Sequence, residues 1–336
     1  GEDGRKKLQN ITRYLTVALA IIESGAMDIG FGRSGLLENY NALNVILVIA
    51  ALTAGSAFLM WIGEQITAHG IRNGISIVLT INIISRVPQD IAALFKQFVF
   101  GSNIAKGVVA AIIIMAIIIG MVILVIILND GVRKIPVQYA KKMQGRKMVG
   151  GQTTSIPLRV NTAGVIPVIF AQSLMTFPLI IMQIVKPNFD YSSVGGKIIR
   201  ALSSNNWFNR NNMILTLGVI LYIVLIVFFA YFYTSLTFNP LEIANNMKRA
   251  GGFIPGIRPG KPTSDYLNQI LNYIVFIGAV GLTIVAVIPI SFNGVFNANV
   301  SFGGTSIIIV VGVVVETLKQ VESQMRVRYY KGFLND

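Results

Sequence analysis

The sequence has 336 residues, of which 54% are apolar and only 12% are charged, and its mean hydropathy is +0.67. Soluble domains carry about 25% charged residues, so these values exclude a water-soluble fold and place much of the chain in lipid. The net charge of +14 is typical of membrane proteins whose basic loops gather on one face and set their orientation. It also fits a docking surface for an acidic or polyanionic partner.

The residue types that carry most enzyme and metal chemistry are scarce. The chain has no cysteine and a single histidine, His69, which is too few for a disulfide, a zinc–thiolate site or a histidine-based metal site. The serines and threonines of the apolar segments have no buried histidine or lysine to activate them. We therefore expect no catalytic residue, no metal and no cofactor, and we do not expect an enzyme.

Apolar segments long enough to cross a bilayer follow one another along the chain. A hydrocarbon core of about 30 Å needs about 20 helical residues. Six segments meet this requirement, namely Asn39–Gly63, Gly107–Asn129, Val160–Val185, Asn211–Leu241 and two that share the charge-free stretch Tyr266–Val315, which the predicted hairpin Ser291–Ser301 divides. Two weaker segments, Tyr14–Ile22 and Asn73–Ser85, suit helices with one face on water or protein. We therefore predict eight spans.

The distribution of basic residues supports this number of spans. With the N-terminus in the cytoplasm, 20 of the 28 basic residues fall on the cytoplasmic side, and the C-terminus lies there too. Two cytoplasmic loops, residues 129–159 and 239–266, exceed the usual connection length of about 2–6 residues. The first carries seven basic residues against one aspartate, and the glycines and prolines of the second predict tight turns.

Five motifs now indicate a family. They are TAGSAFLMWIGEQ at Thr53–Gln65, which continues as ITAHGIRNGISI, NTAGVIPVIF at Asn161–Phe170, FNP at Phe238–Pro240, FIPGIRPG at Phe253–Gly260 and FGGTSIIIV at Phe302–Val310. In this order and spacing they resemble the bacterial SecY family, whose members correspond to the alpha subunit of the eukaryotic Sec translocon. The resemblance covers essentially the whole chain.

The resemblance implies an all-α polytopic channel of ten spans arranged as two inverted halves. The opening GEDGRKKLQNITRYLT looks like the segment that leads into the third span. We therefore expect eight of the ten spans here, with the first span, the plug and the second span outside this sequence. Residues 1–100 would be the remainder of the N-terminal half, with family spans 3–5, and residues 101–336 the C-terminal half, with spans 6–10.

The resemblance also implies a function and a constriction. The family passes unfolded polypeptides across the bacterial inner membrane and releases apolar segments sideways into lipid. Its pore ring of bulky aliphatic side chains matches Ile75, Leu79, Ile166, Ile169 and Ile309. An apolar ring hinders ions and water by dewetting. From spacing alone, the same residues would suit an ordinary core or a lipid-facing surface.

A lateral gate is implied beside this ring. Ser173 and Phe177 match gate positions and continue the helical stripe of Ile166 and Ile169. Glu23 departs from the family, whose members carry glutamine there. A carboxylate at the bilayer centre costs at least about 2.5–3.5 kcal/mol when it faces lipid. We therefore expect Glu23 to face the gate helix, unless its helix starts early enough to place it in the outer headgroup region.

Basic side chains of the two cytoplasmic loops match the positions that dock the ribosome and the SecA ATPase. They are Arg133, Lys134, Lys141, Lys142, Arg146, Lys147 and Arg258. Clustered Lys and Arg without base specificity suit the phosphates of ribosomal RNA, although the orientation signal alone would also explain them. The other implied partners are SecE and SecG, signal peptides and nascent chains, and the lipid bilayer. A secondary transporter for a small solute is the alternative, with Glu23, Ser24 and Gly25 as its only polar midplane group.

Overall fold

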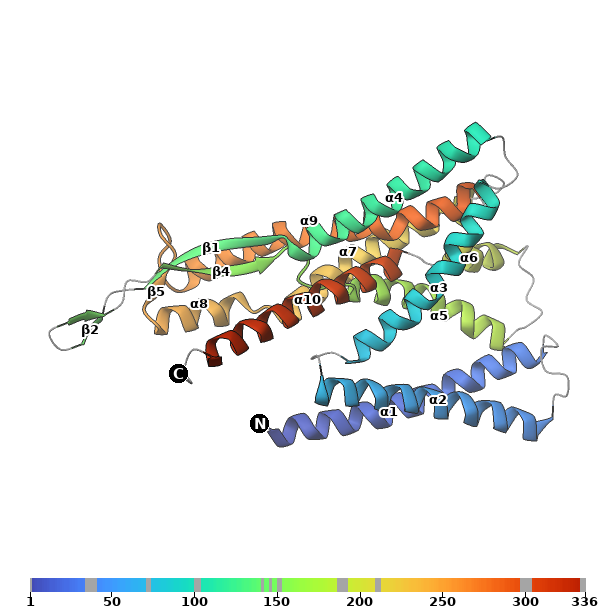
Figure 1. Cartoon of the computed structure of the whole chain (residues 1–336), viewed down its shortest axis with the longest axis horizontal. Helices are drawn as coiled ribbons and strands as arrows, with labels where there is room; N and C mark the ends of the chain where they lie inside the picture. The colour runs from blue at the N-terminus through green and yellow to red at the C-terminus, as the bar shows by residue number, and fades with distance from the viewer. Residues whose placement is uncertain are drawn as a thin grey trace. The chain divides into compact units, whose positions relative to one another are not determined.

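The computed structural model contains ten α-helices among the residues that it describes, and it is almost entirely helical (Figure 1). Those residues are 2–33, 41–70, 74–99, 104–139, 142–144, 147–149, 153–185, 193–208, 213–296 and 304–332. The helices are α1 (Glu2–Arg33), α2 (Ala42–His69), α3 (Gly74–Phe98), α4 (Ile104–Asp130), α5 (Ile166–Val185), α6 (Val194–Leu202), α7 (Leu217–Thr237), α8 (Pro240–Arg249), α9 (Lys261–Phe296) and α10 (Gly304–Gly332). The short strands are β1 (Val132–Tyr139), β2 (Lys142–Gln144), β3 (Lys147–Val149), β4 (Thr153–Arg159) and β5 (Gly252–Phe253).

Six of the described stretches are long and apolar enough to cross a membrane. They are α2, α3, α4 from Gly107, the stretch Leu217–Arg249 that contains α7 and α8, α9 to Asn293, and α10 to Met325. Helix α5 adds a shorter apolar stretch, Ile166–Met182. The expected all-α polytopic membrane fold is confirmed, whereas the number of eight spans stays a prediction.

Three boundaries differ from those expected. The weak segment Tyr14–Ile22 belongs to the 32-residue helix α1, which continues through Glu23. The weak segment Asn73–Ser85 continues to Phe98 as α3. Asp90 and Leu94, one helical turn apart, are both buried in this continuation. The expected hairpin Ser291–Ser301 is wrong in its first half, since α9 runs on to Phe296.

The chain forms two compact units. Unit 1 comprises Gly1–Ser85, Thr176–Arg200 and Glu316–Asp336, and unit 2 comprises Arg86–Met175 and Ala201–Val315. The expected halves, residues 1–100 and 101–336, follow the family's symmetry rather than compactness, and they stay a prediction.

In unit 1, helices α1 and α2 pack as an antiparallel pair. The Arg13 guanidinium donates to the Glu64 carboxylate over 2.7 Å, and Gly25 lies beside Ile49, later on α1 and earlier on α2. Helix α2 then meets the start of α3 so closely that a Cβ on Gly74 would strike the backbone of Gly63. Glycine at both positions is therefore what allows α3 to begin against α2.

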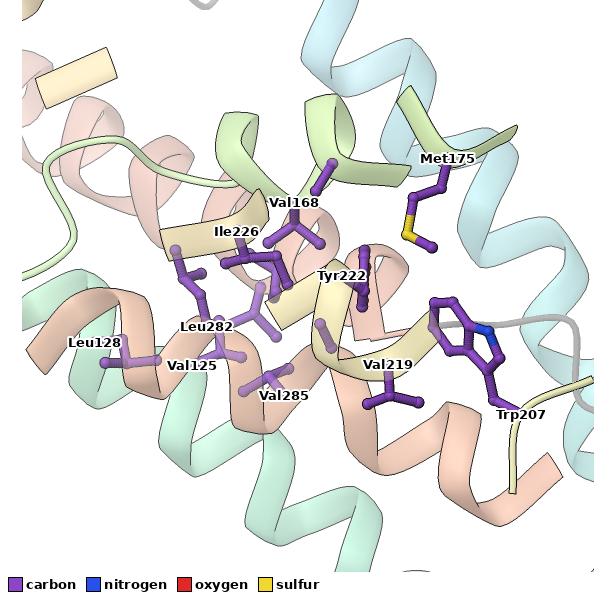
Figure 2. Packing of buried hydrophobic residues seen from close by; sticks show 14 residues of the cluster. Val125, Leu128, Val168, Met175, Trp207, Val219, Tyr222, Ile226, Leu282 and Val285 are labelled. Carbon is purple, nitrogen blue, oxygen red and sulfur yellow. The ribbon is translucent and has the colours of Figure 1, made fainter. Parts of the chain in front are cut away.

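Unit 2 has an extensive core. Figure 2 shows apolar side chains from α4, α5, α7 and α9 converging on one another. Tyr222 of α7 lies at its centre against Trp207, with ring centroids 5.4 Å apart. The indole Nε1 of Trp207 donates to the Ala201 carbonyl over 2.6 Å, which satisfies the one polar atom of this buried side chain.

A small sheet follows α4. Strand β1 lies between β4 and β5 and pairs antiparallel with both. Ile135 and Val137 point from β1 into a second core, where they pack with side chains of β4, α8 and the start of α9. The two expected long loops are therefore largely structured. The first folds as strands, and the second contains α8, β5 and the first turns of α9.

Candidate functional site

The predicted pore residues all lie outside the cores. Ile75 and Leu79 are one turn apart at the start of α3, and both are exposed. Ile166 and Ile169 occupy the first turn of α5, and Ile309 lies on α10 next to the buried Ile308. All five side chains are exposed or half-buried, as a channel lining or a lipid-facing surface requires. Because the five are shared between the two units, the ring itself stays a prediction.

Helix α5 separates a packing face from a free face. Val168, Ala171 and Met175 are buried at intervals of three and four residues. Ser173 and Phe177, the predicted gate residues, are exposed on the remaining surface of the same helix. The core of unit 2 thus fixes which side of α5 is available to a channel or to lipid.

The start of α5 is anchored by hydrogen bonds that the sequence did not reveal. Asn161 Nδ2 donates to Asn129 Oδ1 at the end of α4 over 3.0 Å, and the Val160 N–H donates to the Gly131 carbonyl over 2.8 Å. Gly164 takes a left-handed conformation with φ +64° just before the helix, which favours glycine there. Asn129 and Asn161 are 32 residues apart, so no local pattern connects them.

Glu23 is exposed on α1, directly before the buried Ser24. Ser24 and Asp28 are both buried, one turn apart, so Glu23 lies beside this buried stripe of α1 rather than on it. Its position opposite the gate helix stays a prediction. Asp28 is a buried carboxylate that sequence reasoning missed. Among the residues that the structure describes, its Oδ2 has no hydrogen-bond partner.

The structure describes three of the predicted docking side chains, and their grouping as a docking surface stays a prediction. Arg133 and Lys134 are exposed at the first end of β1, where it leaves α4. Arg258 is exposed in the turn that follows β5, and β5 pairs with the other end of β1 at Tyr139. Six residues of strand separate these ends, which is about 20 Å. Lys141 and Arg146 lie outside the described residues, as do the side chains of Lys142 and Lys147, whose backbones belong to the β2–β3 hairpin.

Glu64 of α2 forms an ion pair with Arg13 of α1. His69 makes a local contact, with Nδ1 3.3 Å from the Gln65 carbonyl oxygen. Among the described residues, no group of three or more His, Asp or Glu side chains is arranged to hold a metal ion. The candidate functional surfaces among the described residues are exposed apolar helix faces and turns with basic side chains.

Long apolar helices with a small, partly basic sheet at their ends define a polytopic helical membrane protein. The SecY family profile matches residues 1–318. This chain belongs to the SecY family. The protein translocase subunit SecY of Streptomyces coelicolor is 43% identical over 355 residues, covering 99% of this chain and 76% of that protein. The Bacillus subtilis protein of the same name is 40% identical over 347 residues, covering 100% of this chain and 77% of that protein.

Solved structures agree on the fold. One, described as concerning the plug domain of the SecY protein and the closed state of the translocation channel, has a TM-score of 0.67 and 19% identity. The match covers 96% of this chain and 75% of the chain in that structure. Another, described as the structure of a protein conducting channel, has a TM-score of 0.63 and 19% identity, with coverage of 96% and 74%.

Proposed function

We propose that this chain is the pore-forming subunit of a protein-translocation channel, which passes unfolded polypeptides across the membrane and releases apolar segments into lipid. Its membership of the SecY family carries the proposal, because its relatives are named as protein translocase subunits. The chain performs no catalysis in this account. A motor ATPase of the SecA type, a translating ribosome or the proton-motive force supplies the energy.

The proposed constriction consists of Ile75, Leu79, Ile166, Ile169 and Ile309. Their exposed or half-buried side chains support it, since a residue that seals a pore cannot be held inside a helix-packing core. Ser173, Phe177 and Glu23 would line the lateral gate. The exposed face of α5 supports this assignment, because it leaves Ser173 and Phe177 free to meet a signal peptide.

The proposed location is the bacterial inner membrane, with the C-terminus and the β1–β4–β5 sheet in the cytoplasm. The basic residues support this orientation through the positive-inside rule. SecE and SecG would be the small membrane partners. Arg133 and Lys134 lie at the first end of β1, whereas Arg258 follows β5, which pairs with the last two residues of β1. A docked SecA or ribosome would therefore contact basic side chains from both of these segments.

The experiment that tests the constriction is ion leak through the purified chain in planar bilayers. Ile309→Asn places a carboxamide in the apolar ring, so we expect higher leak and relaxed signal-sequence selectivity. Ile308→Val, at the buried neighbouring position, is the matched control and should not change the leak. Unchanged leak in Ile309→Asn would contradict the assignment of this ring.

A further inference from the structure

A cavity of about 580 Å³ lies between α7, the start of α8 and α9, within unit 2. Neither the constriction nor the gate uses it. Phe228 and Phe232 of α7 form one wall, and Asn268 and Asn272 of α9 contribute to another. Its volume lies in the range of about 300–1,000 Å³ that is typical of ligand sites. No charged side chain lines it.

The depth of this cavity in the membrane follows from the helices. Helix α7 has 21 residues and is about 31 Å long, which matches the hydrocarbon core. The Tyr231 hydroxyl donates to the Asn272 backbone carbonyl over 3.1 Å, and Tyr231 lies six residues, or about 9 Å, before the end of α7. Asn268 is one turn of α9 closer to that end. The cavity thus covers the level where lipid ester groups meet acyl chains.

The polar side chains of the cavity wall differ in whether they have a hydrogen-bond partner. The hydroxyls of Thr234 and Ser235 are satisfied by the carbonyls of Ala230 and Phe232, each over 2.7 Å. Within the described part of the chain, the side-chain carboxamides of Asn268 and Asn272 have no hydrogen-bond partner, and both residues are exposed. A polar group left unsatisfied near the hydrocarbon costs several kcal/mol. These two amides therefore need hydrogen-bond acceptors from another molecule.

The aromatic wall provides the complementary apolar surface. The rings of Phe228 and Phe232 are nearly parallel, with 12° between their planes and centroids 6.1 Å apart. Phe228 is 58% exposed and Phe232 is 50% exposed. Phe228 lies nine residues before the end of α7, about 14 Å along the helix, so this surface leads from the ester level into the acyl-chain region.

We propose that this cavity binds one membrane phospholipid. The ester carbonyls of its glycerol backbone accept hydrogen bonds from the Asn268 and Asn272 carboxamides, and one acyl chain lies along Phe228 and Phe232. An ester carbonyl is a hydrogen-bond acceptor without a donor, as these amide N–H groups require. Because no charged residue lines the cavity, the site discriminates little between anionic and zwitterionic headgroups.

Native mass spectrometry of the purified, delipidated chain tests this binding. The probes are palmitoyl-oleoyl phosphatidylglycerol and the phosphatidylethanolamine with the same chains. We expect one retained lipid of either type, bound about tenfold or more tightly than in the Asn268→Leu/Asn272→Leu double variant, which loses two hydrogen bonds. Asn245→Leu, at an exposed position of α8 outside the cavity, should bind as the original chain does. Equal affinity in the double variant would overturn the proposal, and so would the absence of a retained lipid.

A second experiment identifies the occupant in native membranes. The chain has no cysteine, so Ser235→Cys introduces one thiol at the cavity wall, which can carry a photoreactive benzophenone. We expect an adduct with the mass of one phospholipid at Cys-substituted position 235 and none in the Asn245→Cys control. A crosslink to another polypeptide, or no adduct at all, would contradict a lipid site.

Discussion

The two tryptophans of this chain lie in opposite environments, one in each unit. Trp207 of unit 2 is 2% exposed, whereas Trp61 of unit 1 is 53% exposed. The helices that surround them follow the same division. Half of the residues in the most apolar part of α9 are buried within the structure, whereas none of those in the most apolar part of α2 are buried. Unit 2 therefore owes its stability to its own core, and the α1–α2 pair offers its apolar surface to lipid or to other protein segments.

This difference in burial predicts where substitutions should lower folding stability. In unit 2, a change at a packed position alters protein–protein contacts that lipid cannot replace. In the α1–α2 pair, an exposed apolar side chain already faces an apolar solvent, so its truncation should alter folding stability little. Matched substitutions in the two units, compared by their effect on the free energy of unfolding, test this contrast.

The tryptophan pair gives the largest expected effect. Trp207→Ala removes a buried ring that packs on Tyr222 and donates to the Ala201 carbonyl, so we expect a loss of about 3–5 kcal/mol in unfolding free energy. Trp61→Ala should stay within about 0.5 kcal/mol. Reversible unfolding in detergent micelles measures both. Similar losses in the two variants would remove the contrast between the units.

Two glycines, one in each unit, allow the same comparison of folding stability. A Cβ on Gly218 of α7 would strike the Ala201 carbonyl oxygen and the indole of Trp207, so Gly218→Val should cost about 1–3 kcal/mol by overpacking. Gly55 of α2 has nothing within 4 Å of its Cβ position. Gly55→Val is the control and should behave as the original chain in the same unfolding measurement. An unchanged unfolding free energy in Gly218→Val would contradict the close packing of α7 against Trp207 and Ala201.

Much of the helical framework could be predicted from the sequence, for a physical reason. Lipid requires long apolar helices, so the stretches that became α2, α4 and α9 are visible as composition alone. The strands could not be foreseen in this way. Only Ile135 and Val137 alternate into the core from β1, and the basic residues before and after them favoured the interpretation of this segment as a loop.

The contacts that position the site were harder to predict than the helices. Asn129 and Asn161 meet because α4 and the start of α5 lie side by side, and neither asparagine stands out in its own segment. Asp28 escaped notice because Glu23 is closer to the centre of the expected span, although Asp28 is the more buried of the two. The family resemblance supplied the pore and gate residues, since exposed aliphatic stripes are common to all membrane helices.

The smallest expected effect concerns the ion pair of unit 1. Arg13 and Glu64 pair over 2.7 Å, but both side chains are partly exposed. Exposed ion pairs contribute about 0.2–1 kcal/mol, so we expect this range for the coupling energy in a double-mutant cycle of Arg13→Gln and Glu64→Gln. The coupling should weaken as salt is raised. A coupling above about 2 kcal/mol would mean that the pair holds the α1–α2 unit together as strongly as a core does.

The most direct test of the channel is crosslinking of an arrested, half-translocated polypeptide to single cysteines. Because the chain has no cysteine of its own, each engineered thiol reports one position. We expect crosslinks from the ring positions Ile75, Leu79, Ile166, Ile169 and Ile309. We expect none from Ile112 and Ile127, which are exposed on α4 outside the proposed ring. Crosslinks from the α4 positions without any from the ring would contradict a pore at this site.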